Sequence, residues 1–202
     1  MDTHRLESLT DNVFAVAMTL LVFDLRVPTS STHESLGSFL FEKWPHYIGY
    51  VISFVVIALI WLQHHWIFRH LQRIDSTIFA VNLALMLVVV FLPFAASTLA
   101  FYVSQHHSQR SAAAFFGFDL TAATIALAGL WRWATTHDSL LRPKTSDGTI
   151  RLLNRRLLLA PCLYLVATVI AMLNAPLGLS AYASTATAFL WLLRPSLLVS
   201  RD

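Results

Sequence analysis

Six long apolar segments alternate with shorter polar stretches along this sequence. Their approximate limits are residues 9–27, 45–68, 76–102, 112–134, 157–173 and 177–193. A helix rises about 1.5 Å per residue, so each segment has the length needed to cross roughly 30 Å of hydrocarbon. Trp44 and Trp66 bracket the second segment, as tryptophans do at membrane interfaces. The pattern predicts an all-α membrane protein in which residues 1–202 form one domain of six transmembrane helices.

The first apolar segment differs from the others because polar side chains interrupt it. At about 100° per residue, four of its residues fall on one narrow stripe of a helix. These are Asn12, Val16, Thr19 and Phe23. Asp11 points roughly a quarter turn away from the stripe. One face of this helix is therefore suited to line a wet path, while Asp11 faces the protein.

A motif at the start of this segment points to a family. Arg5 is followed by Leu9, Thr10 and Asp11, and then by the apolar run VFAVAMTLLV. The arrangement resembles the Arg-x-x-x-Phe-Ser-Asp motif of the transmembrane protein 175 family of potassium channels. Leu9 and Thr10 stand where the motif has Phe and Ser, so the hydroxyl and the acid are kept while the aromatic ring is lost.

The resemblance continues beyond the motif in the order and spacing of further features. They are Trp44-Pro45, the apolar run that ends at His64, Asn82, and Pro93-Phe94. Prokaryotic members of the family are similar in length, so the resemblance covers nearly the whole chain. It implies a potassium-favouring cation channel in a lipid bilayer, with a pore built from the first helix of several copies. The implied assembly is a homotetramer.

Two groups of residues take roles from this resemblance. The implied ion path is lined by Asn12, Val16, Thr19 and Phe23, with an apolar constriction at Val16 and a pore threonine at Thr19. Apolar constrictions of this kind gate by size and by dewetting. The implied polar network, which holds the first helix in place, consists of Arg5, Thr10, Asp11, His64 and Asn82. Two plainer interpretations stay open: ordinary helix packing for the stripe, and a helix cap at the membrane interface for Asp11.

Basic residues are distributed unevenly across the predicted membrane. Eleven of the 14 Lys and Arg residues lie on the side of the N-terminus, and three lie on the other side. Cytoplasmic loops carry the excess of Lys and Arg, so we expect a cell-membrane protein with both termini in the cytoplasm. Two cytoplasmic termini require an even number of spans, which agrees with six.

Composition narrows the functional classes further. The chain is 56% hydrophobic and 12% charged, whereas soluble globular domains have about 25% charged residues. Its net charge of +3 is not clustered on a soluble face, which argues against nucleic-acid binding. Cys162 is the single cysteine, and the adjacent pairs His64-His65 and His106-His107 lack the i, i+4 spacing of zinc ligands. We expect no metal and no cofactor.

Two alternatives to a channel use the same polar residues. A proton- or cation-coupled secondary transporter would use Asp11 and His64 as a relay, but the sequence shows neither inverted repeats nor glycine-broken helices. A membrane-embedded enzyme would use the two residues as acid and base. The sequence has no nucleophile elbow, phosphate loop or metal set, so we expect no enzymatic activity. It also lacks a re-entrant filter loop of the TVGYG kind.

Overall fold

The computed structural model describes residues 3–25, 36–42, 44–103, 108–143 and 146–198. The His106-His107 pair lies outside these ranges. Within them the chain folds into seven α-helices and two short 3-10 helices. In order, they are α1 (Thr3–Leu20), η1 (Leu21–Asp24), α2 (Leu36–Glu42), α3 (Trp44–His70), α4 (Ser76–Val103), α5 (Gln109–Thr136), η2 (Asp138–Leu140), α6 (Asp147–Leu173) and α7 (Ala175–Leu198).

Five stretches of the described helices are long and apolar enough to cross a membrane. They are Thr3–Phe23, Gly49–His70, Ser76–Val103, Gln109–Thr136 and Ile150–Leu173. The expectation of an all-helical membrane protein is therefore confirmed. α7 is 24 residues long and is not among the five. The sixth span thus stays a prediction.

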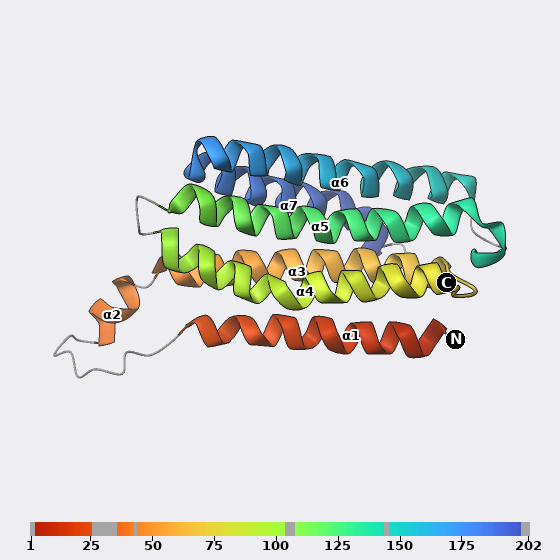
Figure 1. The fold of residues 1–202 in the computed structure, drawn as a ribbon, viewed down its shortest axis with the longest axis horizontal. Helices are drawn as coiled ribbons and strands as arrows, with labels where there is room; N and C mark the ends of the chain where they lie inside the picture. The colour runs from red at the N-terminus through yellow and green to blue at the C-terminus, as the bar shows by residue number, and fades with distance from the viewer. Residues whose placement is uncertain (1–2, 26–35, 43, 104–107, 144–145, 199–202) are drawn as a thin grey trace.

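The long helices lie side by side along one common axis (Figure 1). α5, α6 and α7 form one side of the bundle, α3 and α4 lie in the middle, and α1 forms the opposite edge (Figure 1). α1 contacts only α3, α4 and η1 among the described elements. One long side of α1 consequently has no neighbour among these elements.

α6 is longer than the apolar segment that predicts it. The helix begins at Asp147, whereas the apolar segment begins at about residue 157. The intervening residues are rich in Leu and Arg, which favour helix, so the helix continues past the hydrocarbon into the polar region. The short helix α2 likewise begins inside the stretch expected to be a polar loop.

The end of the bundle at which α3 passes into α4 is fixed by hydrogen bonds. Asp75 Oδ1 accepts from the backbone N–H of Ile78 at 2.8 Å, and Asp75 Oδ2 accepts from the indole Nε1 of Trp133 on α5 at 2.8 Å. The first bond satisfies a free amide in the opening turn of α4. An antiparallel bridge between Leu71 and Leu141 joins the two loops at the same end. The start of α4 is therefore tied to the end of α5.

A close approach of three helices surrounds Gly117 on α5. A Cβ atom at this position would meet the hydroxyl groups of Tyr182 on α7 and Thr168 on α6. The Tyr182 hydroxyl donates to the carbonyl of Ala113 at 3.1 Å and lies 3.2 Å from Thr168 Oγ1. Any side chain at position 117 would displace this buried tyrosine.

We expect Gly117→Ala to destabilise the bundle by about 1–3 kcal/mol, because overpacking forces the helices and Tyr182 apart. Thermal unfolding in mild detergent measures the effect. Gly49→Ala on α3 is the matched control, because nothing lies within 4 Å of its added Cβ. Alanine suits a helix interior better than glycine, so the control should unfold at the same or a slightly higher temperature. Equal behaviour of the two variants would contradict the close approach.

The bonds to Asp75 predict a pH-dependent contribution to stability. Burial opposes ionisation, but the hydrogen bonds from Ile78 and Trp133 outweigh it and hold the pKa of Asp75 below its usual value. A lowered pKa stabilises the fold above the pKa of the unfolded chain, about 4, and the contribution disappears as the pH falls through the folded pKa. Asp75→Asn should lower the melting temperature at pH 7, and the difference from wild type should shrink toward pH 3. A difference that is constant with pH would contradict this assignment.

Candidate functional site

α1 presents two distinct faces. Its inner face is buried against α3 and α4 through Leu6, Thr10, Phe14 and Ala17. Its outer face is open and includes large apolar side chains, with exposed fractions of 46% for Leu9, 52% for Val16 and 40% for Leu20. The two faces together define the candidate site. The inner face holds α1 against α3 and α4, and the outer face is exposed.

A chain of hydrogen bonds joins the inner face to the two neighbouring helices. Asn82 Nδ2 on α4 donates to Thr10 Oγ1 at 2.8 Å, and Asn82 Oδ1 lies 2.9 Å from His64 Nε2 on α3. The amide oxygen only accepts, so His64 Nε2–H is the donor. Thr10 Oγ1 in turn donates to the carbonyl of Leu6 at 2.9 Å. All three side chains have no exposed surface, so α1, α4 and α3 are bonded to one another inside the core.

His64 is enclosed by aromatic rings. Its ring centroid lies 4.2 Å from that of Phe68 and 5.8 Å from that of Phe14. Nδ1 of His64 is buried and has no hydrogen-bond partner among the described residues. A proton relay through a histidine needs a partner on both ring nitrogens, and the described surroundings provide one on Nε2 alone. Among the described residues, His64 is therefore the last member of this series of hydrogen bonds.

Asp11 is adjacent to Thr10 in sequence, but its described hydrogen bond is to a residue outside this series. Its Oδ1 accepts from the indole Nε1 of Trp61 on α3 at 2.8 Å. One turn earlier, Glu7 Oε1 lies 3.2 Å from Nδ1 of His65. Arg5 is exposed. Of the five residues expected in one network, hydrogen bonds therefore join Thr10, Asn82 and His64, while Asp11 has another partner.

Trp61 and His65 are contacts that sequence reasoning missed. The two residues are four positions apart on α3, and their partners Glu7 and Asp11 are also four positions apart on α1. Residues four apart share a helix face, so this matched spacing was the available signal. An indole inside an apolar run is usual in membrane proteins, which is why it did not stand out.

The outer face of α1 carries three of the four stripe residues, and the fourth, Phe23, follows on η1. Asn12 and Thr19 are exposed, and the exposed fractions of Val16 and Phe23 are 52% and 69%. Thr19 Oγ1 donates its hydrogen to the carbonyl of Val16 at 2.8 Å. The hydroxyl oxygen therefore faces outward as an acceptor, which suits contact with a cation. The structure places the stripe on the uncovered face, and its role in an ion path stays a prediction.

Comparison with known proteins places this geometry in a family. Residues 5–93 match the model of the family described as endosomal/lysosomal potassium channel TMEM175. A potassium channel from Streptomyces collinus is 32% identical over 90% of this chain and 88% of its own length. One from Chamaesiphon minutus is 35% identical over 86% of both chains. The chain belongs to the TMEM175 family.

The solved structures agree with this membership. The crystal structure of a lysosomal potassium-selective channel TMEM175 homolog from Chamaesiphon minutus matches with a TM-score of 0.83 and 31% identity. The match covers 94% of this chain and 96% of that chain. A TMEM175 potassium-channel variant bound to a nanobody fusion shares the fold, with a TM-score of 0.65 and 18% identity. The family resemblance drawn from the sequence motif is therefore confirmed, and this member of the TMEM175 family is a potassium channel.

The buried chain of bonds yields a test by double substitution. Asn82→Leu should leave His64 Nε2–H without an acceptor and cost about 1–3 kcal/mol for this stranded group, whereas the Thr10 hydroxyl keeps its bond to Leu6. His64→Phe should cost less, and the double variant should be more stable than the sum of the two single effects predicts. Free energies of unfolding in detergent give the coupling. Strictly additive effects would contradict a bond between the two side chains.

Proposed function

We propose that four copies of this TMEM175 member assemble around their α1 helices, which line a potassium-favouring pore. The observation that supports the proposal most is the mixed character of the outer face of α1. Asn12 and Thr19 lie there beside Val16 and Phe23, on a helix of the length that spans a membrane. Polar side chains that face lipid are costly, whereas they are normal beside a water-filled path.

A single copy of α1 does not enclose a path. The helix lies at the edge of the subunit, and its outer face has no neighbour among the described elements (Figure 1). Closed rings of identical subunits are the usual way to bring one such face onto an axis. The number four is taken from the family resemblance, and the exposed stripe provides the surface that meets there.

The proposed path has an apolar neck followed by an oxygen ring. Val16 forms the neck, because its side chain is exposed and branched close to the helix. Thr19, nearly one turn further along, presents a hydroxyl oxygen whose hydrogen is already donated to Val16. Acceptor oxygens of this kind replace part of the hydration shell of a cation. Asn12 and Phe23 line the two mouths.

The inner face of α1 supports this function by fixing the rotation of the helix. Thr10 is bonded through Asn82 to His64, so α1 is held by two neighbouring helices at one depth. Asp11 adds a separate bond to Trp61. We propose that these residues are structural, and that Arg5, which is exposed, acts near the membrane surface.

A coupled transporter that uses Asp11 and His64 as a relay finds less support. Each of the two residues has its own partner, Trp61 for Asp11 and Asn82 for His64. A relay needs a continuous path of hydrogen bonds, and none is formed between the two side chains in the described structure. A channel also fits the names of the two bacterial relatives described above, which are potassium channels.

The proposed topology has six spans with both termini in the cytoplasm of a cell membrane protein. α1 begins at the end of the bundle where α3 ends and α6 begins (Figure 1). That end carries the exposed Arg69 and Arg73 on or after α3 and Arg151 on α6. An excess of basic residues on the cytoplasmic side supports this orientation.

Substitutions at Val16 test the pore directly. Val16→Phe should close the neck, and Val16→Asn should wet it, raising potassium current and reducing discrimination against sodium. Thr19→Val should lower conductance while the oligomer still forms, because it removes only an oxygen. Reversal potentials in potassium and sodium gradients, measured in reconstituted bilayers, report the changes.

Val169→Asn on α6 is the matched control. Val169 has the same exposed fraction as Val16, 52%, but lies on a helix at the other side of the subunit. The control should leave ion preference unchanged. A well-assembled Val16→Asn oligomer with the selectivity of wild type would overturn the pore assignment.

A further inference from the structure

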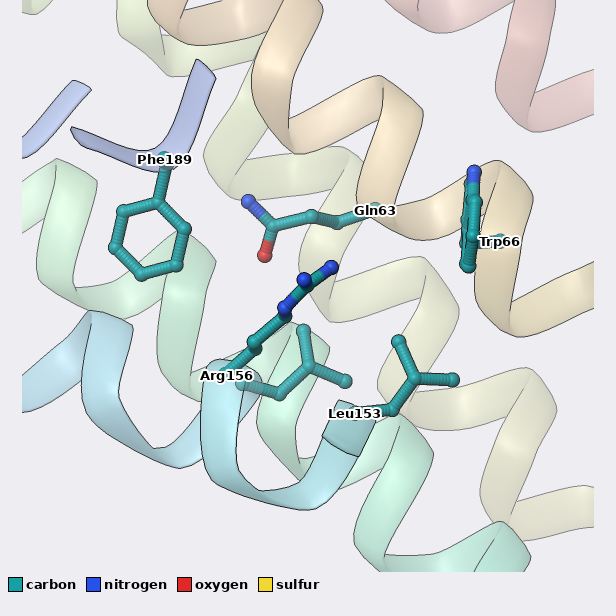
Figure 2. Close-up of a pocket in the computed structure, with 6 residues that line it drawn as sticks. Gln63, Trp66, Leu153, Arg156 and Phe189 are labelled. Atoms are coloured by element: carbon teal, nitrogen blue, oxygen red, sulfur yellow. The ribbon is translucent and has the colours of Figure 1, made fainter. Parts of the chain in front are cut away.

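A groove between α3, α6 and α7 lies on the side of the subunit away from α1. It is open to the surface and is lined by Gln63, Trp66, Leu153, Arg156, Leu157 and Phe189. Figure 2 shows the Arg156 side chain rising from α6 toward Gln63, with Phe189 on one side and Trp66 on the other. Four of the six lining side chains are apolar or aromatic. The groove thus combines one cation with an apolar wall.

Arg156 is poorly satisfied in this setting. Its Nη1 is buried and has no hydrogen-bond partner among the described residues. No carboxylate among the described residues forms an ion pair with Arg156. Arg156 as a whole is partly exposed, but a buried N–H without an acceptor is costly. An anionic oxygen would satisfy this Nη1.

The groove lies near one end of the bundle. Trp66 is close to the end of α3, and Arg156 is close to the start of α6, where Arg151 and Arg155 are exposed. Tryptophan favours the depth of lipid headgroups. Clustered arginines at that depth attract anionic headgroups.

We propose that this groove binds an anionic phospholipid, with its phosphate on Arg156 and an acyl chain along Trp66, Leu153, Leu157 and Phe189. A planar guanidinium matches two phosphate oxygens at once, and charge-assisted bonds of this kind are strong. A free anion would gain nothing from the apolar wall, whereas a lipid uses both parts of the groove. The site is separate from the stripe on α1 and does not depend on the pore.

The test measures lipid retained by the purified protein. Native mass spectrometry in mild detergent would compare added phosphatidylglycerol with phosphatidylcholine, and thermal unfolding would compare both with inorganic phosphate. Wild type should retain phosphatidylglycerol preferentially and be stabilised by it, with little effect of inorganic phosphate. Equal stabilisation by inorganic phosphate would identify a site for free anions and would overturn the proposal of a lipid site.

Three variants locate the site. Arg156→Gln should bind phosphatidylglycerol roughly tenfold more weakly, because it removes a charged hydrogen-bond donor. Arg155→Gln, which removes the same charge from an exposed neighbour, should bind like wild type. Gln63→Glu keeps the groove intact and provides an internal carboxylate beside Arg156, so it should fold well and lose the preference for phosphatidylglycerol.

The outcomes separate a built site from general attraction. Equal losses in Arg156→Gln and Arg155→Gln would show that surface charge alone retains the lipid, and would overturn the proposal. If Arg156→Gln does not fold, Gln63→Glu decides the matter. Unchanged lipid preference in a folded Gln63→Glu would place the lipid elsewhere.

Discussion

The buried bonds from Thr10 through Asn82 to His64 are the constraint on which the rest of the structure depends. They join α1 to α4 and α3 inside the core, where the three side chains have no exposed surface, with distances of 2.8 Å and 2.9 Å. A polar group that loses its partner there costs far more than one at a wet surface. α1 therefore cannot rotate by even one residue, about 100°, without breaking the bonds. These bonds decide which face of α1 is inside and so which face carries Val16 outward.

Sequence reasoning predicted the long helices because their signal is local. Apolar length and the tryptophans at their ends follow from the membrane itself, and a motif at Arg5 to Asp11 identified the family. The hydrogen-bond partners of polar side chains were harder to predict from the sequence, because they depend on how two helices are rotated about their axes. Asp11 was expected in one polar network with His64, and its described hydrogen bond is to Trp61, which lies on the adjacent side of α3. The groove around Arg156 is lined by residues from three helices, and no sequence spacing indicates that these residues lie together.

The environment of a membrane protein changes which surface features are informative. Exposed leucines and phenylalanines on α4 or α6 are ordinary, since lipid is as apolar as they are. The informative positions are the polar ones that lie among them. Asn12 and Thr19 on α1 and Arg156 in the groove are of this kind, and each requires something that lipid tails do not supply. In the proposed pore, water and ions would meet the first need, and in the proposed groove a charged headgroup would meet the second.

The hydroxyl of Thr19 has a consequence for how the proposed pore treats charge. Its hydrogen is committed to the Val16 carbonyl at 2.8 Å, so each copy of α1 offers the axis the negative end of a fixed dipole. The four stripe residues include no acid, base or histidine. Preference for cations over anions would then arise from oriented neutral groups, which do not titrate. A pore of this design continues to prefer cations to anions when the surrounding solution becomes acidic.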